Sequence, residues 1–116
     1  MAKKTLSGYT VQESNNLQVY SDYSFAEVVL TTSYQDLFNS SSAGAPAKQV
    51  ILYSTHASVD IEAADILSIK LNGSSTVMKI KGGMLPFTID NMVLTQVEIL
   101  TSDVDANETL GCLAFL

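Results

Sequence analysis

The sequence predicts an all-β protein, an antiparallel β-sandwich built from about eight short strands. Residues 66–71 and 76–81 alternate apolar and polar side chains, and the Asn72-Gly73 pair between them is typical of a hairpin turn. Further short alternating segments follow one another along the chain with turn residues between them, which is typical of a sandwich or barrel. Eight strands are enough for a jelly-roll-like arrangement, although the order of pairing is not contained in one sequence.

The size and composition predict one domain with one core. The chain has 116 residues, of which 47% are hydrophobic and 16% charged. This composition is far from the low hydrophobicity and high charge of disordered chains. A domain of this length buries about two thirds of the surface that its unfolded chain exposes.

The first 24 residues predict an extended arm ahead of a single β-sandwich domain at residues 25–116. Gly8, Asn15, Asn16 and many hydroxyl residues separate a few apolar anchors such as Leu17 and Val19. Two interpretations stay open for this arm. It lies on a neighbouring subunit, or it is a partly ordered terminus.

The β-rich domain is expected to begin with a strand at 25–32, where β-branched residues alternate. Residues 33–38 are too few for a stable helix and predict a turn whose Leu37 and Phe38 reach into the core. The Ser-, Ala- and Gly-rich residues 39–48 predict a loop. Further strands are expected at 49–55, 58–62, 66–71, 76–81, 86–89, 95–101 and 109–116, with turns at 81–83 and 89–91.

The strand patterns predict how the faces are used. In residues 95–100, Val97 and Ile99 point to one side while Gln96 and Glu98 point to the other, so one face of that sheet is solvated. Residues 50–53 and 113–116 are apolar on both sides. These are either central strands covered on both faces, or strands whose outer side meets another subunit. The apolar C-terminal strand favours an oligomer, because exposed hydrophobic strands invite pairing.

The charge balance argues against nucleic-acid partners. Twelve acidic residues, six lysines and no arginine give a net charge of −6. Phosphate and base recognition needs clustered Lys and Arg, and the lysines here are scattered. The chain also holds neither a secretory leader pattern nor an apolar run of the roughly 20 residues that cross a bilayer. We therefore expect a protein made and folded in cytosol-like conditions, without a membrane partner.

No set of residues predicts catalysis, a cofactor or a transition metal. His56 is the single histidine, a Gly-x-Ser-x-Gly elbow is missing, and His56 is interpreted as a turn residue. Cys112 is the single cysteine, and its apolar neighbours predict a small buried side chain. One histidine and one cysteine do not make a zinc site, for which four ligands are usual. We expect no enzyme, and no catalytic, cofactor-binding or metal residues.

Two acidic segments are candidate sites. Asp103, Asp105, Asn107 and Glu108 offer oxygen ligands but lack the EF-hand glycine, so residues 103–108 are interpreted as a solvated loop, with calcium binding left open. In residues 58–62, alternation places Asp60 and Glu62 on one face of a half-exposed strand, followed by Asp65. A glycosidase pair is disfavoured, because the chain has no tryptophan to bind a sugar.

Residues 49–116 resemble small accessory virion proteins of tailed bacteriophages. The resemblance rests on the order of four segments: Leu71-Asn72-Gly73-Ser74, Met78-Lys79-Ile80-Lys81-Gly82-Gly83, Pro86-Phe87-Thr88-Ile89-Asp90-Asn91-Met92 and Val97-Glu98-Ile99-Leu100. It implies a capsid decoration (cement) or head-spike protein, often a trimer, seated on the major capsid protein.

The resulting expectation is a non-enzymatic structural protein that decorates or reinforces a phage virion through protein–protein contacts. The arm (residues 6–23) and the closing strand (residues 110–116) are expected to contact neighbours. Alternatives are a phage tail or fibre component and a glycan-binding, receptor-recognition module. A cupin-like enzyme would need a cluster of histidines. The glycan-binding module would stack sugars on exposed members of Tyr9, Tyr20, Tyr23, Tyr34 and Tyr53.

Overall fold

The structure is a computed structural model that describes residues 22–103 and 108–116. It contains eight strands and two short helical turns. In chain order these are β1 (Tyr23–Val29), β2 (Gln35–Asn39), α2 (Ser40–Ala43), β3 (Ala47–Ser54), β4 (Ile66–Leu71), β5 (Met78–Lys81), the 3-10 turn η1 (Gly82–Met84), β6 (Phe87–Leu94), β7 (Gln96–Thr101) and β8 (Thr109–Phe115).

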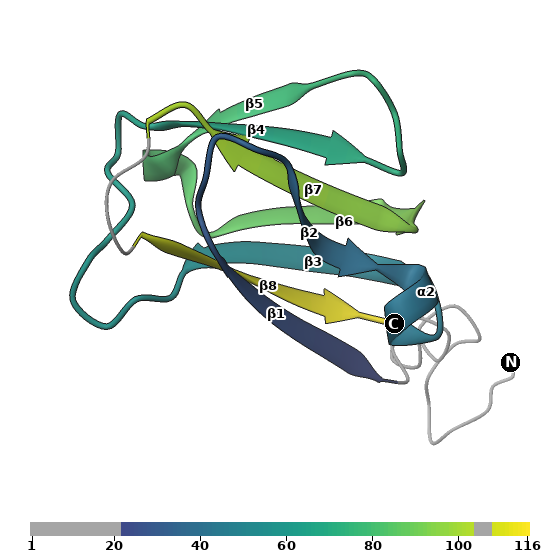
Figure 1. Cartoon of the computed structure of the whole chain (residues 1–116). Helices are drawn as coiled ribbons and strands as arrows, with labels where there is room; N and C mark the ends of the chain where they lie inside the picture. The colour runs from purple at the N-terminus through teal and green to yellow at the C-terminus, as the bar shows by residue number, and fades with distance from the viewer. Residues whose placement is uncertain (1–21, 104–107) are drawn as a thin grey trace, which may run out of the picture.

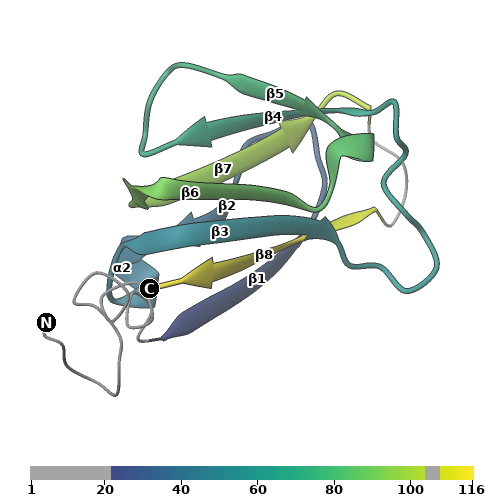
Figure 2. The same cartoon turned by 180° about the vertical axis from the view of Figure 1, so that it is seen from behind.

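The eight strands form two four-stranded antiparallel sheets (Figure 1). The first sheet has the order β1-β8-β3-β6 and the second has the order β2-β7-β4-β5. The reverse view shows the same two layers, with β1 and β5 at opposite extremes of the molecule (Figure 2). The predicted all-β sandwich is confirmed. We interpret the strand order as jelly-roll-like, because successive strands mostly alternate between the sheets.

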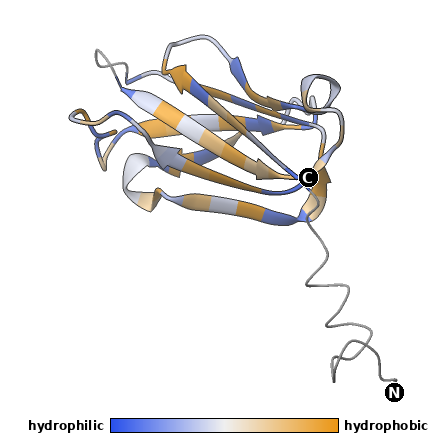
Figure 3. Ribbon diagram, turned by 90° about the horizontal axis from the view of Figure 1, so that it is seen from below, coloured by the Kyte–Doolittle hydropathy of each residue, from blue (hydrophilic) through white to orange (hydrophobic). Residues whose placement is uncertain are grey.

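The core lies between the two sheets and is built by residues at every second position of their strands. Apolar and polar positions alternate along the ribbons (Figure 3). Burial of each large aliphatic side chain contributes about 1.5–3 kcal/mol. The first sheet contributes Val50, Leu52, Leu110, Cys112 and Ala114, and the second contributes Leu67, Ile69, Val97 and Ile99.

The predicted hairpin at Asn72-Gly73 is confirmed, and Asn72 also holds a corner of the sandwich. Asn72 and Gly73 both adopt positive φ, 56° and 70°, between the paired strands β4 and β5. The Asn72 Oδ1 accepts hydrogen bonds from the Thr95 backbone N–H (2.7 Å) and hydroxyl (3.1 Å), and its Nδ2 donates to the Val93 carbonyl (2.9 Å). Thr95 is the residue at which the chain passes from β6 in the first sheet to β7 in the second.

The turn predicted at residues 89–91 is wrong. These residues lie within β6, where Asn91 adopts φ 60° and the pairing with β3 shifts register between Ala47 and Gln49. The strand therefore bulges instead of reversing, because β3 continues to pair with Asp90 on one side of the bulge and Leu94 on the other.

Two further predictions, for residues 33–38 and 39–48, are corrected. Residues 33–38 were expected to form a turn, but Gln35–Asn39 is strand β2, which pairs with β7. Leu37 and Phe38 are buried as predicted. The loop expected at 39–48 contains the single-turn helix α2 and the beginning of β3.

The strand expected at 58–62 is also wrong. Residues 55–65 are irregular, and the Gly82 and Gly83 N–H groups donate to the carbonyls of Asp65 and Ala63. A Cβ on Gly82 would collide with the Glu62 carbonyl oxygen, so only glycine permits this close approach. The bend predicted at 81–83 is present as η1.

Most of the arm predicted at 1–24 lies outside the described residues. Tyr23 and Ser24 were included in the arm, but they are the first two residues of β1. Asp22 is already held by the sheet, because its carbonyl accepts a hydrogen bond from the Leu116 N–H at 2.9 Å. The described β-structure therefore begins two residues earlier than predicted.

Candidate interaction surface

The outer side of the first sheet is apolar. Along β1 the even-numbered residues turn toward the second sheet, while Tyr23, Phe25 and Val29 are 65%, 50% and 53% exposed. The strand register extends this row of outward side chains onto β8, because Tyr23 pairs with Phe115 and Phe25 pairs with Leu113. We call the outward apolar set the apolar face: Tyr23, Phe25, Val29, Ile51, Tyr53, Leu113 and Phe115.

Gly111 lets two aromatic rings meet across the middle of the apolar face. It lies on β8 directly between Glu27 of β1 and Tyr53 of β3. The rings of Phe25 and Tyr53 approach each other above it, with centroids 6.3 Å apart and planes inclined by 35°. A Cβ on Gly111 would lie 3.2 Å from Phe25 Cε1 and would collide with the Thr55 methyl group. The missing side chain thus makes room for a connected aromatic surface.

Charged residues are sparse on this side of the molecule, and most of them are acidic. At outward positions of the first sheet, Glu27 on β1 and Asp90 on β6 are exposed, and the exposed Asp22 precedes β1. The exposed Lys48 lies at the register shift of β3. The apolar face therefore has a rim that is mainly negative.

The outer side of the second sheet has a different character. Lys70 of β4 pairs with Glu98 of β7, and its Nζ lies 4.2 Å from the centre of the Tyr34 ring. The Gln96 side-chain amide donates to Asp36 Oδ1 at 2.8 Å. The charged side chains at outward positions of this sheet form what we call the charged face: Asp36, Lys70, Lys79, Lys81 and Glu98. Ile66 and Leu100 share this outer side and are half-buried.

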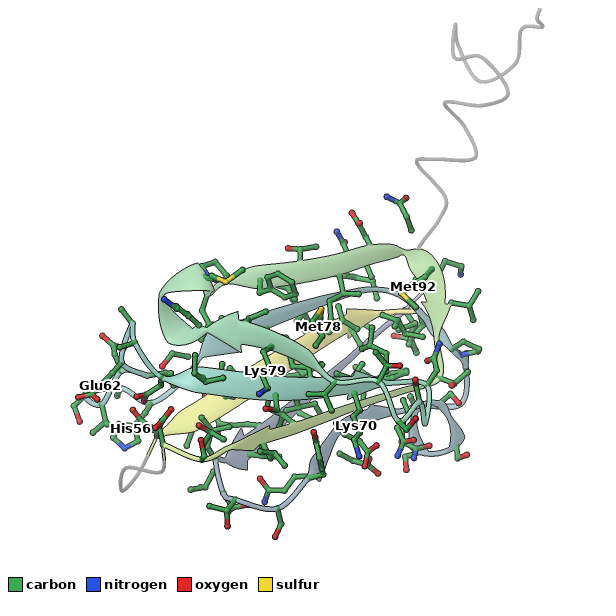
Figure 4. All side chains as sticks on the ribbon, turned by 90° about the horizontal axis from the view of Figure 1, so that it is seen from above. His56, Glu62, Lys70, Met78, Lys79 and Met92 are labelled. Atoms are coloured by element: carbon green, nitrogen blue, oxygen red, sulfur yellow. The ribbon has the colours of Figure 1, made fainter. Side chains whose placement is uncertain are left out.

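A separate apolar depression opens between the edge strands β5 and β6. Leu71, Met78 and Met92 line it, and Asn72 closes one side. Met92 lies toward the end of the sandwich opposite to His56 and Glu62 (Figure 4). The depression exposes part of the core between the sheets, whereas the apolar face is a continuous outer surface.

His56 lies in the irregular segment after β3. Its Nδ1 accepts hydrogen bonds from the backbone N–H groups of Ser58 (3.1 Å) and Val59 (3.0 Å). The ring therefore caps a turn, and Nδ1 is already occupied. Within the segments that the structure describes, no three His, Cys, Asp or Glu side chains come together as a metal site.

The acidic candidate residues differ from one another in burial and in hydrogen bonding. Asp60 and Glu62 are exposed on the irregular segment, and Asp65 is buried. Asp103 Oδ2 accepts a hydrogen bond from the Ile66 N–H at 3.0 Å, and Glu108 is buried at the base of β8. Asp105 and Asn107, the other proposed calcium ligands, lie outside the described residues.

Cys112 is buried on the inner side of β8, as predicted. Burial raises the pKa of its thiol from 9.0 to about 12, because the thiolate would lose its hydration. The thiol is therefore protonated at neutral pH. It packs as an apolar side chain.

The tyrosines considered as sugar platforms are placed differently from one another. Tyr23 is the most exposed, Tyr53 is half-buried against Phe25, and Tyr34 is half-buried below Lys70. Tyr9 and Tyr20 lie outside the described residues. Sequence reasoning noticed the two-sided apolar strands 50–53 and 113–116 but missed Tyr23 and Phe25 as their continuation, because Tyr23 was assigned to the arm.

Comparison with protein-family models, with curated proteins and with solved structures found no match to this chain. Among the described residues, no helix has the length and apolar character needed to cross a membrane.

Proposed function

We propose that this protein is a non-enzymatic structural component of a bacteriophage virion, which decorates or reinforces the capsid through protein–protein contacts. The observation that carries the proposal is the apolar face. Its aromatic and aliphatic side chains lie on the outside of a sheet whose inner side already forms the core. Large exposed apolar patches commonly mark protein–protein contacts.

The chemistry of the apolar face suits a protein partner. Tyr and Phe are enriched in the centre of interfaces, where they bury much area with few rotatable bonds. Phe25 and Tyr53 already contact each other, so part of the ordering cost of binding is met before a partner arrives. The resemblance to phage accessory virion proteins supplies the expected partner, the major capsid protein or another virion protein.

We further propose that the protein acts as a homo-oligomer, with a trimer favoured by that resemblance. β1 is an edge strand, and its outward residues Tyr23, Phe25 and Val29 are more exposed than the outward residues of the central strands β3 and β8. A contact that covers this edge would remove the largest exposed apolar side chains of the first sheet from water.

The proposal is tested on particles. Virions purified from a host that carries the gene are analysed by mass spectrometry for this chain, and then stripped and rebound with purified protein. We expect the chain in the particle fraction and saturable rebinding that Phe25→Ser weakens at least tenfold. Its absence from purified particles, or rebinding unaffected by Phe25→Ser, would contradict the proposal.

A glycan-binding or receptor-recognition role is the second candidate, and the exposed ring of Tyr23 favours it. Tyr23 lies one outward position from Phe25, so two aromatic side chains are neighbours on one surface. Sugars stack on such rings, whereas a protein partner needs the whole apolar face. A glycan array discriminates the two, because selective binding that Tyr23→Ala abolishes would favour sugar recognition.

A further inference from the structure

The apolar face needs an occupant, and the segment of this chain that precedes β1 has the matching chemistry. None of the described residues covers the apolar face, which leaves Tyr23 and Phe25 at least half exposed. Residues 1–21 are connected to it directly, through Asp22. Their length and composition can be compared with what the face requires.

The apolar residues of this segment alternate in two places. Tyr9 and Val11 form one pair and Leu17 and Val19 form another, each separated by a polar residue. In an extended backbone, residues two apart point to the same side. The segment also lacks proline, since both prolines of the chain lie later, at positions 46 and 86. Extended, it would present an apolar side to a surface.

The charges of the segment and of the rest of the chain are complementary. Residues 1–21 contain two lysines, Lys3 and Lys4, and one glutamate, for a net charge of +1. Residues 22–116 contain four lysines and eleven acidic residues, for a net charge of −7. The acidic residues around the apolar face are Asp22, Glu27 and Asp90. Lysines at the end of a docked segment would therefore meet a rim of opposite charge.

We infer that the apolar face receives residues 1–21 of a neighbouring copy of this chain. This inference rests on the proposed oligomer. The segment joins the fold at the end of the first sheet, because Asp22 accepts a hydrogen bond from Leu116 at the end of β8. To reach its own apolar face, the chain would have to reverse direction beside Tyr23. To reach the face of a neighbour, it needs no reversal.

The reach of the segment is sufficient for such an exchange. Twenty-one extended residues span up to about 70 Å, and a strand the length of β1 spans about 24 Å. Direct stacking of two apolar faces is less favourable, because it would bring Glu27 and Asp90 of one copy toward the same residues of the other. The exchanged segment covers the aromatic rings without that repulsion.

Disulfide trapping between two singly substituted chains tests the inference on purified full-length protein. One chain carries Ser7→Cys, Thr10→Cys or Gln18→Cys, and the other carries Thr88→Cys. Thr88 is exposed on β6, and its pairing with Ile51 places it on the outer side of the first sheet. The matched control is Lys79→Cys, an exposed residue on the charged face. Native Cys112 is buried and is present in every chain.

After mild oxidation of the mixture, we expect a mixed disulfide between at least one of the N-terminal positions and Thr88→Cys. Its yield should exceed that with Lys79→Cys at least fivefold, and Phe25→Ser in the acceptor chain should reduce it. Equal yields for the two acceptors, or no mixed disulfide, would overturn the inference. A doubly substituted chain that links only within itself would also overturn it, because the segment then covers its own face.

The trapping result can be told apart from the virion result, although both involve Phe25. If the exchanged segment covers the apolar face, that face is a contact between copies, and the weaker rebinding of Phe25→Ser to particles follows from loss of the oligomer. Trapping uses purified protein alone, so its failure would leave attachment to particles intact as the proposed function. Conversely, trapping could succeed in a protein that never enters a virion. A melting curve for each variant shows that the substituted chains are folded before oxidation.

Discussion

The two outer faces of this sandwich differ, although both sheets bury their inner sides in the same core. The charged face of the second sheet carries lysines and acidic residues at outward positions, such as Lys70 and its cross-strand neighbour Glu98. The apolar face of the first sheet carries Tyr23, Phe25 and Leu113 at equivalent outward positions. An antiparallel sheet needs cover on one side only, and the second sheet follows this rule. The first sheet therefore carries apolar residues that the core itself does not require.

The largest expected effect is a loss of stability at high pH, caused by Cys112 on the inner side of the first sheet. Since the pKa of Cys112 is raised from 9.0 to about 12, the unfolded thiol ionises first as the pH rises. Below pH 9 the thiol is protonated in both states, so its ionisation does not lower the free energy of unfolding. Between pH 9 and 12 the unfolded thiol ionises and the folded thiol does not, which lowers the free energy of unfolding by up to about 4 kcal/mol. Urea unfolding at pH 8 to 11 checks this. Cys112→Ala should have a flatter pH dependence than the parent, and identical slopes would contradict the assignment.

The outer side of the first sheet is tested by Gly111→Val, with Ser68→Val as its counterpart on the second sheet. A side chain at Gly111 collides with Thr55 and crowds the Phe25 ring, so we expect a loss of about 3 kcal/mol. Ser68 is half-buried at an outward position of β4, and its substitution should change stability by less than about 0.5 kcal/mol. Chemical unfolding measures both. Similar losses would show that the two outer sides do not differ in packing.

The corner that joins the sheets is tested by a pair of asparagines with the same backbone conformation. Asn72 and Asn91 both have φ near 60°, but Asn72 alone holds Val93 and Thr95 through its side chain. Asn72→Gly keeps the backbone permissive and removes those hydrogen bonds, at a cost of about 2 kcal/mol. Asn91→Gly should be close to neutral. If thermal unfolding ranks the two variants equally, the corner does not depend on the Asn72 side chain.

The charged face should give the smallest effect. Lys70→Gln removes the cation from above the Tyr34 ring and the opposite charge from Glu98, for a loss of about 0.5–1 kcal/mol. The loss should shrink in high salt because exposed charges are screened. Lys79→Gln is the control, since Lys79 pairs with the uncharged Ser68. A loss above 2 kcal/mol would indicate that this face contributes more than solvated charges do.

Local sequence patterns predicted the sandwich and several strands, because residues that are close together in the chain specify a hairpin turn or an alternating strand. The Asn72-Gly73 turn specifies a hairpin by its own backbone preference, and β4 lies at residues 66–71 as predicted. Strand β2 was missed because its five residues are stabilised by pairing with β7, some sixty positions away. The strand expected at 58–62 failed for the opposite reason, since Gly82 approaches that backbone too closely for a regular strand. In both places a contact between residues far apart in the chain decided the local structure.

The candidate surface was partly visible in the sequence. Residues 50–53 and 113–116 are apolar on both sides. From the sequence alone they are either central strands covered on both faces or strands whose outer side meets another subunit. The structure shows that they belong to the adjacent central strands β3 and β8, with no described element over their outer sides. What the sequence lacked was the strand order, which places Tyr23 and Phe25 of β1 beside Phe115 and Leu113 and joins distant residues into one apolar face.

Light scattering of the purified full-length protein over a hundredfold range of concentration tests the central claim most directly. If the apolar face mediates association, the parent chain forms a discrete oligomer and Phe25→Ser shifts it to monomer. Val77→Ser is the matched control, because Val77 is an exposed apolar residue between β4 and β5 of the second sheet, and it should keep the oligomer. A parent chain that is monomeric throughout, or a Phe25→Ser oligomer as stable as that of Val77→Ser, would contradict the account.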